Sequence, residues 1–172
     1  MTGFWRQIFL GRDLWVTLAA SALPGALLDY QTLVKASPTL VSAQLQVAPA
    51  LLGVALAGLA VLVVFLDRRY IALLESVPPG IAADIFPFQW TAALAVVTLV
   101  LSLVLGYVSV MPESYWVLFR ASFIVALWSF LYLLWSVLDL LAFLAAHARN
   151  RITQLKAEQQ SEHRDDEASP TS

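Results

Sequence analysis

Long runs of apolar residues dominate the pattern of hydrophobic and polar positions along this chain. Three runs, residues 47–66, 90–110 and 115–146, are long enough to cross a bilayer, because a spanning helix needs about 20 apolar residues. The first run ends at a charged sequence that contains Arg68 and Arg69, and the other two begin at aromatic residues of the kind found at membrane interfaces. The pattern predicts three transmembrane helices with well-marked ends.

A fourth apolar run, residues 14–34, is close to the minimum length for a span and contains an acidic residue, Asp29. A proline and a glycine before Asp29 predict a kink in this helix. If the run crosses and both termini are cytoplasmic, every Lys and Arg except Lys35 and Arg120 lies on the inner side. Positive residues concentrate on the cytoplasmic side of membrane proteins, so the sequence favours four spans with both termini inside.

The start of the chain has two interpretations. A cleavable signal peptide would place its cleavage site at the small residues Ala20 to Ala22. The apolar stretch before these residues is short for that purpose, so we favour a retained segment. Residues 1–13 are then a basic, aromatic interfacial segment that lies along the inner membrane surface.

The segments after the second and fourth spans are predicted to face the cytoplasm. Residues 67–89 form a cytoplasmic loop, in which Arg68 and Arg69 are expected to contact anionic lipid headgroups at the inner leaflet. The fourth helix is longer than a span requires, so we expect it to continue as a cytoplasmic helical extension over residues 147–160. Residues 161–172 are polar without apolar periodicity and are predicted to form a disordered tail.

The composition supports a membrane location and excludes several functions. Hydrophobic residues make up 60% of the chain and charged residues 13%, whereas a soluble domain has about 45–50% and 25%. A net charge of -2 lacks the clustered positive charge that nucleic-acid binding requires. The chain has no cysteine, and His147 and His163 follow the fourth span. We therefore expect no cofactor, no metal site and no thiol or buried histidine for catalysis.

Small and hydroxyl residues recur at helical spacing within the predicted spans. In lipid, such residues allow close approach and hydrogen bonding between helices. Two interpretations compete: the seams pack helices together, or they line a narrow polar conduit in an oligomer. We favour packing, which is the usual role of small residues in membranes. The seam residues are Gly53 and Ala57 in the second span, Thr98 and Ser102 in the third, and Ser122, Ser129 and Ser136 in the fourth.

Two charged residues fall within predicted spans at a similar depth. Asp29 and Arg120 each lie several residues below the outer end of a helix. Charges inside a bilayer usually pair with each other or face water. We therefore predict an intramembrane ion pair between Asp29 and Arg120, with separate boundary positions as the alternative.

Together these features predict an all-α integral membrane protein of the cell membrane, with four transmembrane helices and a last helix that extends into the cytoplasm. We expect it not to be an enzyme but an assembly, accessory or interaction subunit that acts through helix packing and its cytoplasmic face. The expected partners are membrane lipids and either further copies of the chain or another membrane protein. The alternative function is a small oligomeric ion channel. Hydroxyl seams that face an axis between copies would favour the channel, and seams buried within one chain would favour the subunit.

Overall fold

The computed structural model describes residues 12–65 and 81–168, with side chains described over residues 13–63 and 85–149. Within these ranges the chain is all-helical. Three helices are long and apolar enough to cross a membrane, over Tyr30–Val63, Ile85–Val108 and Glu113–Arg149, and a shorter apolar helix covers Asp13–Leu27. The elements in order are α2 (Arg12–Leu27), α3 (Tyr30–Phe65), α5 (Ile81–Val108), the short 3-10 helix η1 (Glu113–Tyr115) and α6 (Trp116–Ala168). The predicted all-α, membrane-type architecture is confirmed at this level.

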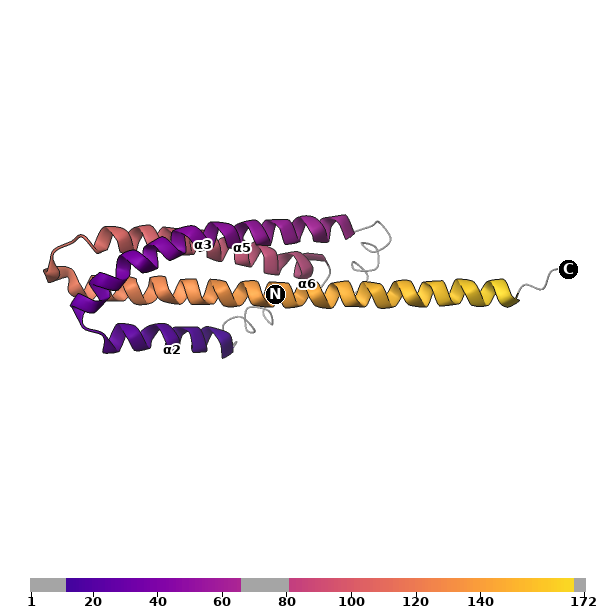
Figure 1. Cartoon of the computed structure of the whole chain (residues 1–172), viewed down its shortest axis with the longest axis horizontal. Helices are drawn as coiled ribbons and strands as arrows, with labels where there is room; N and C mark the ends of the chain where they lie inside the picture. Colours follow the sequence, from indigo (N-terminus) through magenta and orange to yellow (C-terminus); the bar gives the residue numbers. More distant parts are fainter. Residues whose placement is uncertain (1–11, 66–80, 169–172) are drawn as a thin grey trace.

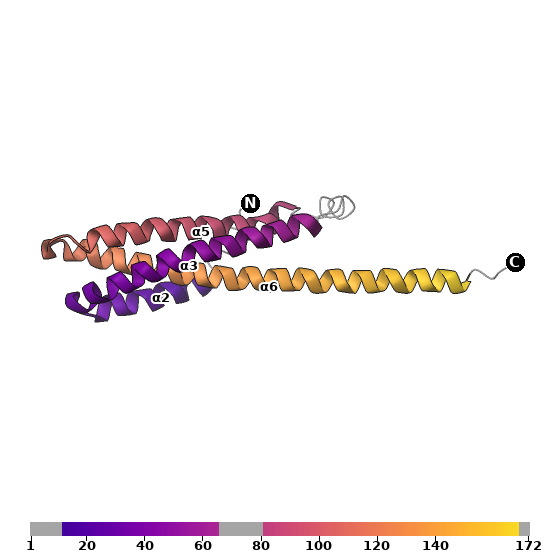
Figure 2. The same cartoon turned by 45° about the horizontal axis from the view of Figure 1, so that its top comes forward.

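The helices form an elongated bundle whose longest member is α6. The turn from α2 to α3 and the connection from α5 to α6 lie at one end of the bundle, and α6 continues beyond the other end (Figure 1). α3, α5 and α6 pack against one another, while α2 packs along α6. Figure 2 shows the same arrangement from a second direction, in which the turn between α2 and α3 lies below the start of α6. In the part of the chain that the structure describes, the bundle therefore consists of three long helices with a shorter fourth attached to α6.

The segment predicted as one kinked helix over residues 14–34 is two helices. The Leu28 amide donates to the Pro24 carbonyl at 3.0 Å, and the Leu33 amide donates to the Asp29 carbonyl at 3.1 Å, so one helix closes and the next begins across this point. The chain reverses direction there (Figure 1). α3 then runs without interruption through residues 35–46, which were expected to connect two spans. The prediction of a kink was correct in place but underestimated the break.

Other predicted boundaries also shift. α5 begins at Ile81, so the end of the predicted loop over residues 67–89 is helical. Phe88, predicted at the membrane interface, is only 2% exposed within the bundle. α6 extends through residue 168, although residues 161–172 were predicted to be disordered. The reason is local: α6 contains neither Pro nor Gly, and Gln, Glu, Arg and Ala favour helix. Residues 1–11, 66–80 and 169–172 lie outside the described part of the chain, and so do Arg68 and Arg69.

The core of the bundle is three layers of side chains along its length. In the second and third layers from the α5 to α6 connection, alanines allow the helices to approach closely. Close approach is the principal source of helix association in lipid. The layers hold Leu33, Leu105 and Phe119 near the α5 to α6 connection, Ala48, Ala95 and Leu133 in the middle, and Ala55, Phe88 and Leu140 toward the far end. Each layer takes residues from α3, α5 and α6, which fixes the register of these three helices.

Gly25 fixes how closely α2 approaches α6. A Cβ atom at this position would overlap the side chain of Ile124, whereas a Cβ at Gly53 would meet nothing within 4 Å. We expect Gly25→Ala to destabilise the bundle by about 1–3 kcal/mol through overpacking. Gly53→Ala is the matched control and should be neutral or slightly stabilising, because Ala favours helix. Thermal unfolding of both variants in a detergent that keeps the chain monomeric measures the difference. Equal melting temperatures would contradict this account of α2 packing.

Candidate functional site

The centre of the bundle contains a polar network that joins three helices. Gln44 on α3 is fully buried, and its Nε2 donates to the carbonyl of Ala126 on α6 at 2.7 Å. Ser102 on α5 donates to Oε1 of the same side chain at 2.5 Å. Both ends of the Gln44 amide are therefore satisfied by neighbouring helices. A buried amide with this pairing specifies one register for α3, α5 and α6.

One donor hydrogen in the network is shared and another is unused. The Ser102 hydroxyl also lies 2.7 Å from the Thr98 carbonyl, so its single hydrogen serves two acceptors. The Thr98 hydroxyl is buried and has no hydrogen-bond partner among the described residues. Ser129, 1% exposed, turns its hydroxyl back to the Ala126 carbonyl on its own helix at 2.9 Å. The polar centre is thus formed by neutral groups of a single chain.

A second contact between hydroxyl groups lies further along α5 and α6. The hydroxyls of Thr91 and Ser136 are 2.7 Å apart, and the Thr91 hydroxyl is also 2.9 Å from the Pro87 carbonyl. Pro87 lies within α5, so this second contact stays within one helix. Ser122, also on α6, is partly buried. Of the predicted seam residues, Ser102 and Ser136 therefore make hydrogen bonds between helices of the same chain.

The small-residue seam predicted for α3 is on the opposite side from the bundle. Gly53 and Ala57 are exposed, whereas Ala48 and Ala55 of the same helix are 0% and 1% exposed. α3 carries two small faces, and the sequence alone offered no means to decide which one packs inside. The structure places Gly53 and Ala57 on the outer face. Their predicted role in packing therefore has no partner within the described chain, and packing between copies stays a prediction.

Arg120 binds the end of α2 and not Asp29. The guanidinium donates from Nε to the Gly25 carbonyl and from Nη2 to the Ala26 carbonyl. It also lies 5.6 Å from the centre of the Trp116 ring, within the range of a cation–π interaction. The last carbonyls of a helix have no partner within that helix and carry partial negative charge. Arg120 therefore supplies the missing donors to α2.

Asp29 has a separate role as the N-terminal cap of α3. Its carboxylate accepts from the Thr32 hydroxyl at 2.5 Å and from the Thr32 amide at 3.3 Å. The Thr32 hydroxyl lowers the pKa of the Asp29 carboxyl below its ordinary value of 3.8. Because the folded pKa is lowered, the cap is complete above that value and weakens as pH falls through the folded pKa. The predicted ion pair with Arg120 is thus replaced by two helix caps at the same turn.

Gln44 was missed by the sequence interpretation, although it is central to the site. The sequence contains a usable signal, since Gln44 lies only a few residues from a long apolar run. The sequence analysis places residues 35–46 between two spans. A glutamine in such a connection does not indicate a buried polar site. A helix that continued through this segment would have placed a polar amide inside the bundle.

Comparisons with known protein families, curated proteins and solved structures gave no match for this chain. Among the described residues there is also no group of three or more His, Asp or Glu side chains arranged to hold a metal ion. The function must therefore be argued from the network, the helix caps and the shape of the bundle.

Replacing Gln44 should test the importance of the central network. Gln44→Leu leaves the hydroxyl of Ser102 without its acceptor on α3 and removes the donor to Ala126, so we expect a loss of about 1–2 kcal/mol in stability. Gln46→Leu is a matched control, because Gln46 is exposed two residues away on the same helix. Chemical unfolding in a detergent that keeps the chain monomeric compares the two. A larger loss for Gln46→Leu would contradict this assignment.

Arg120 and Asp29 should respond differently to mutation. Arg120→Gln removes the charged donors from the end of α2, and we expect hydrogen exchange of the α2 amides to accelerate about tenfold. Asp29→Asn should leave α2 unchanged, because Asn also caps helix N-termini and Asp29 contacts α3. Hydrogen–deuterium exchange in detergent micelles follows both variants. Equal acceleration of α2 exchange by the two substitutions would instead support a direct ion pair.

Proposed function

We propose that this chain is a non-enzymatic, multi-pass protein of the cell membrane that serves as an assembly or accessory subunit. In this proposal the helical bundle anchors the protein in the bilayer, and the end of α6 that leaves the bundle presents a docking element in the cytoplasm. The projection of α6 is the observation that carries the proposal. The proposal also includes four membrane crossings, with both termini on the cytoplasmic side.

The position of α2 supports a fourth crossing. Leu14 in its first turn packs against the core layer that holds Val137, two residues before Asp139, and its last turn is bound by Arg120. The α6 segment between Arg120 and Asp139 is about 28 Å long at 1.5 Å per residue, close to the roughly 30 Å hydrocarbon core. α2 thus covers nearly the same depth as the spanning part of α6, although it is shorter than a usual span.

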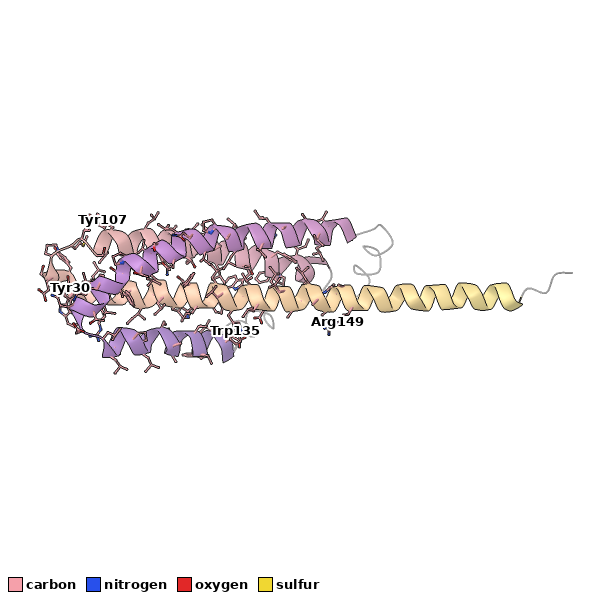
Figure 3. The ribbon with its side chains drawn as sticks, in the orientation of Figure 1. Tyr30, Tyr107, Trp135 and Arg149 are labelled. Carbon is pink, nitrogen blue, oxygen red and sulfur yellow. The ribbon has the colours of Figure 1, made fainter. Side chains whose placement is uncertain are left out.

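The ends of the bundle carry residues suited to membrane interfaces. Tyr30 and Tyr107 lie at the end where α2 turns into α3, and Arg149 lies near the level where α3 and α5 approach their opposite ends (Figure 3). Tyr107 is 67% exposed, as expected for an aromatic residue at headgroup level. This arrangement favours the Arg149 end as the cytoplasmic side, in agreement with the distribution of positive residues.

α6 projects well beyond the ends of the other described helices (Figure 1). Beyond Arg149, α6 continues to Ala168, a length of about 28 Å. No other described helix runs beside this part of α6 in either view (Figures 1 and 2). Isolated helices in water are only marginally stable, so a helix of this kind gains from a partner surface. This supports a docking role for the α6 extension.

The alternative, a small oligomeric channel, has less support. Its expected lining included Thr98, Ser102, Ser129 and Ser136, and these side chains are taken up by contacts within one chain. A conduit between copies would need polar groups that face outward. The accessory role therefore remains the proposal that best fits the interior of the bundle.

The proposal is tested by interrupting the α6 extension. Thr153→Pro should break the helix beyond the bundle, because proline removes a backbone donor and clashes with the preceding turn. In membranes of the cells that make this protein, we expect the full chain to migrate on native gels in a complex heavier than its own oligomer. The variant should lose the heavier complex and keep the melting temperature of the bundle.

Two outcomes would overturn the accessory role. The first is a wild-type chain that migrates only as copies of itself. The second is ion leakage from vesicles reconstituted with the purified chain, which would favour the channel. Thr153→Ser is the control for the substitution, because it changes the same position without interrupting the helix.

A further inference from the structure

The outward face of α3 carries a polar side chain at a depth where the neighbouring helices expose only apolar ones. Gln46 is exposed, and no hydrogen bond to its side chain occurs within the described residues. Successive helical residues are about 100° apart, so Gln46 points about 200° away from Gln44. Because Gln44 is fully buried in the centre of the bundle, Gln46 must face outward.

The contacts of Gln44 fix the depth of Gln46. Gln44 pairs with Ser102 and Ala126, which lie about 9 Å and 15 Å from the outer ends of α5 and α6. Gln46 is about 3 Å further toward the middle of the bundle. At this level α5 exposes Val100 and Leu103, which are 55% and 63% exposed. These are side chains that suit lipid, so the same lipid would surround Gln46.

An unpaired amide at this depth is unfavourable. Transfer of an amide into an apolar environment without a hydrogen bond costs about 2–7 kcal/mol. Gln46 also lies at the head of a line of exposed small residues on the same face of α3, at helical steps of four, three, four and three. These residues are Ala50, Gly53, Ala57 and Ala60. A Cβ at Gly53 would meet nothing within 4 Å, so a second helix has room to approach closely there.

We infer that this face of α3 is a self-association interface, and that its occupant is a second copy of the chain. The inference rests on the membrane location in the proposed function and does not depend on the α6 extension. Two copies inserted in the same direction place their α3 helices in parallel. A two-fold axis between them then brings Gln46 opposite its own counterpart, and Gly53 opposite its own.

The chemistry of Gln46 favours a second copy over another occupant. A glutamine amide has both donor hydrogens and an acceptor oxygen, so two identical amides across a two-fold axis satisfy each other. The small residues further along α3 let the backbones meet, as small-xxx-small motifs do in membrane dimers. Gly53 and Ala57 have this spacing. The proposed interface thus corresponds to the predicted packing between copies.

Cysteine cross-linking tests the geometry directly, because the natural chain contains no cysteine. Single substitutions Gly53→Cys and Ala57→Cys place thiols on the proposed interface. Val54→Cys and Leu56→Cys are matched controls: both side chains are exposed, at 41% and 54%, but each lies about 100° around the helix from its neighbour on the interface. After oxidation in phospholipid vesicles, we expect covalent dimers from the first pair and little from the second.

A second measurement tests the role of Gln46 itself. Purified chains labelled with donor and acceptor dyes are reconstituted in phosphatidylcholine vesicles, and energy transfer is followed as the chain is diluted in lipid. We expect Gln46→Leu to weaken self-association by roughly threefold to tenfold, the size expected from one or two interhelical hydrogen bonds. Gln46→Asn should retain much of the association. Circular dichroism should be unchanged for both, since Gln46 is exposed and its side chain makes no hydrogen bond among the described residues.

Three results would overturn the inference. One is a chain that stays monomeric in vesicles at high protein density, which would assign Gln46 to a different membrane protein. Another is equal cross-linking from interface and control cysteines. The third is energy transfer that does not change on Gln46→Leu. None of these depends on the complexes formed by the α6 extension, so this inference and the accessory function can fail separately.

Discussion

Polar groups inside an apolar bundle have no water to bind, so each must find a partner in the protein or remain at a high cost in free energy. The rest of this structure depends on that constraint. Gln44 meets it by bridging to Ser102 on α5 and to the Ala126 carbonyl on α6. Apolar side chains can slide past one another with little change in energy, but a buried amide with two fixed partners cannot. The network therefore fixes the register that the apolar layers leave loosely specified.

The same constraint explains how the chain reverses direction between α2 and α3. A reversal exposes the last carbonyls of one helix and the first amides of the next. Arg120 serves the carbonyls of α2, and Asp29 serves the amides of α3. Opposite charges at one turn suggest an ion pair, but each of these charged groups instead hydrogen-bonds at a helix end. The two caps also complement the helix dipoles, since the positive group lies at a C-terminus and the negative group at an N-terminus.

Much of the architecture was accessible from the sequence, because apolar run length depends only on the thickness of the bilayer. Ser102 and Ser129, which the sequence marked as seam residues, are buried within the bundle, and hydroxyls at helical spacing have few other uses in lipid. The break at Asp29 was harder to predict. An acid after Pro24 and Gly25 is compatible with a kink or a new helix, and the choice depends on Thr32 and Arg120, one of which is far away in sequence. Gln44 was missed for a related reason, because a polar stretch beside a span resembles a loop.

The two small faces of α3 show why pattern alone could not decide how this helix packs. Ala48 and Ala55 lie on one face and Gly53 and Ala57 on the other, so either face allows close approach. Gln44 and Gln46 decide which of the two faces packs inside the bundle. Gln44 pairs with a serine and with the Ala126 carbonyl on its side. Once that pairing forms, Gln46 must point outward, because two residues along a helix face nearly opposite directions. Satisfying one amide within the chain thus leaves the other to be satisfied from outside it. The inner network and the outer face of α3 are consequences of the same pair of residues.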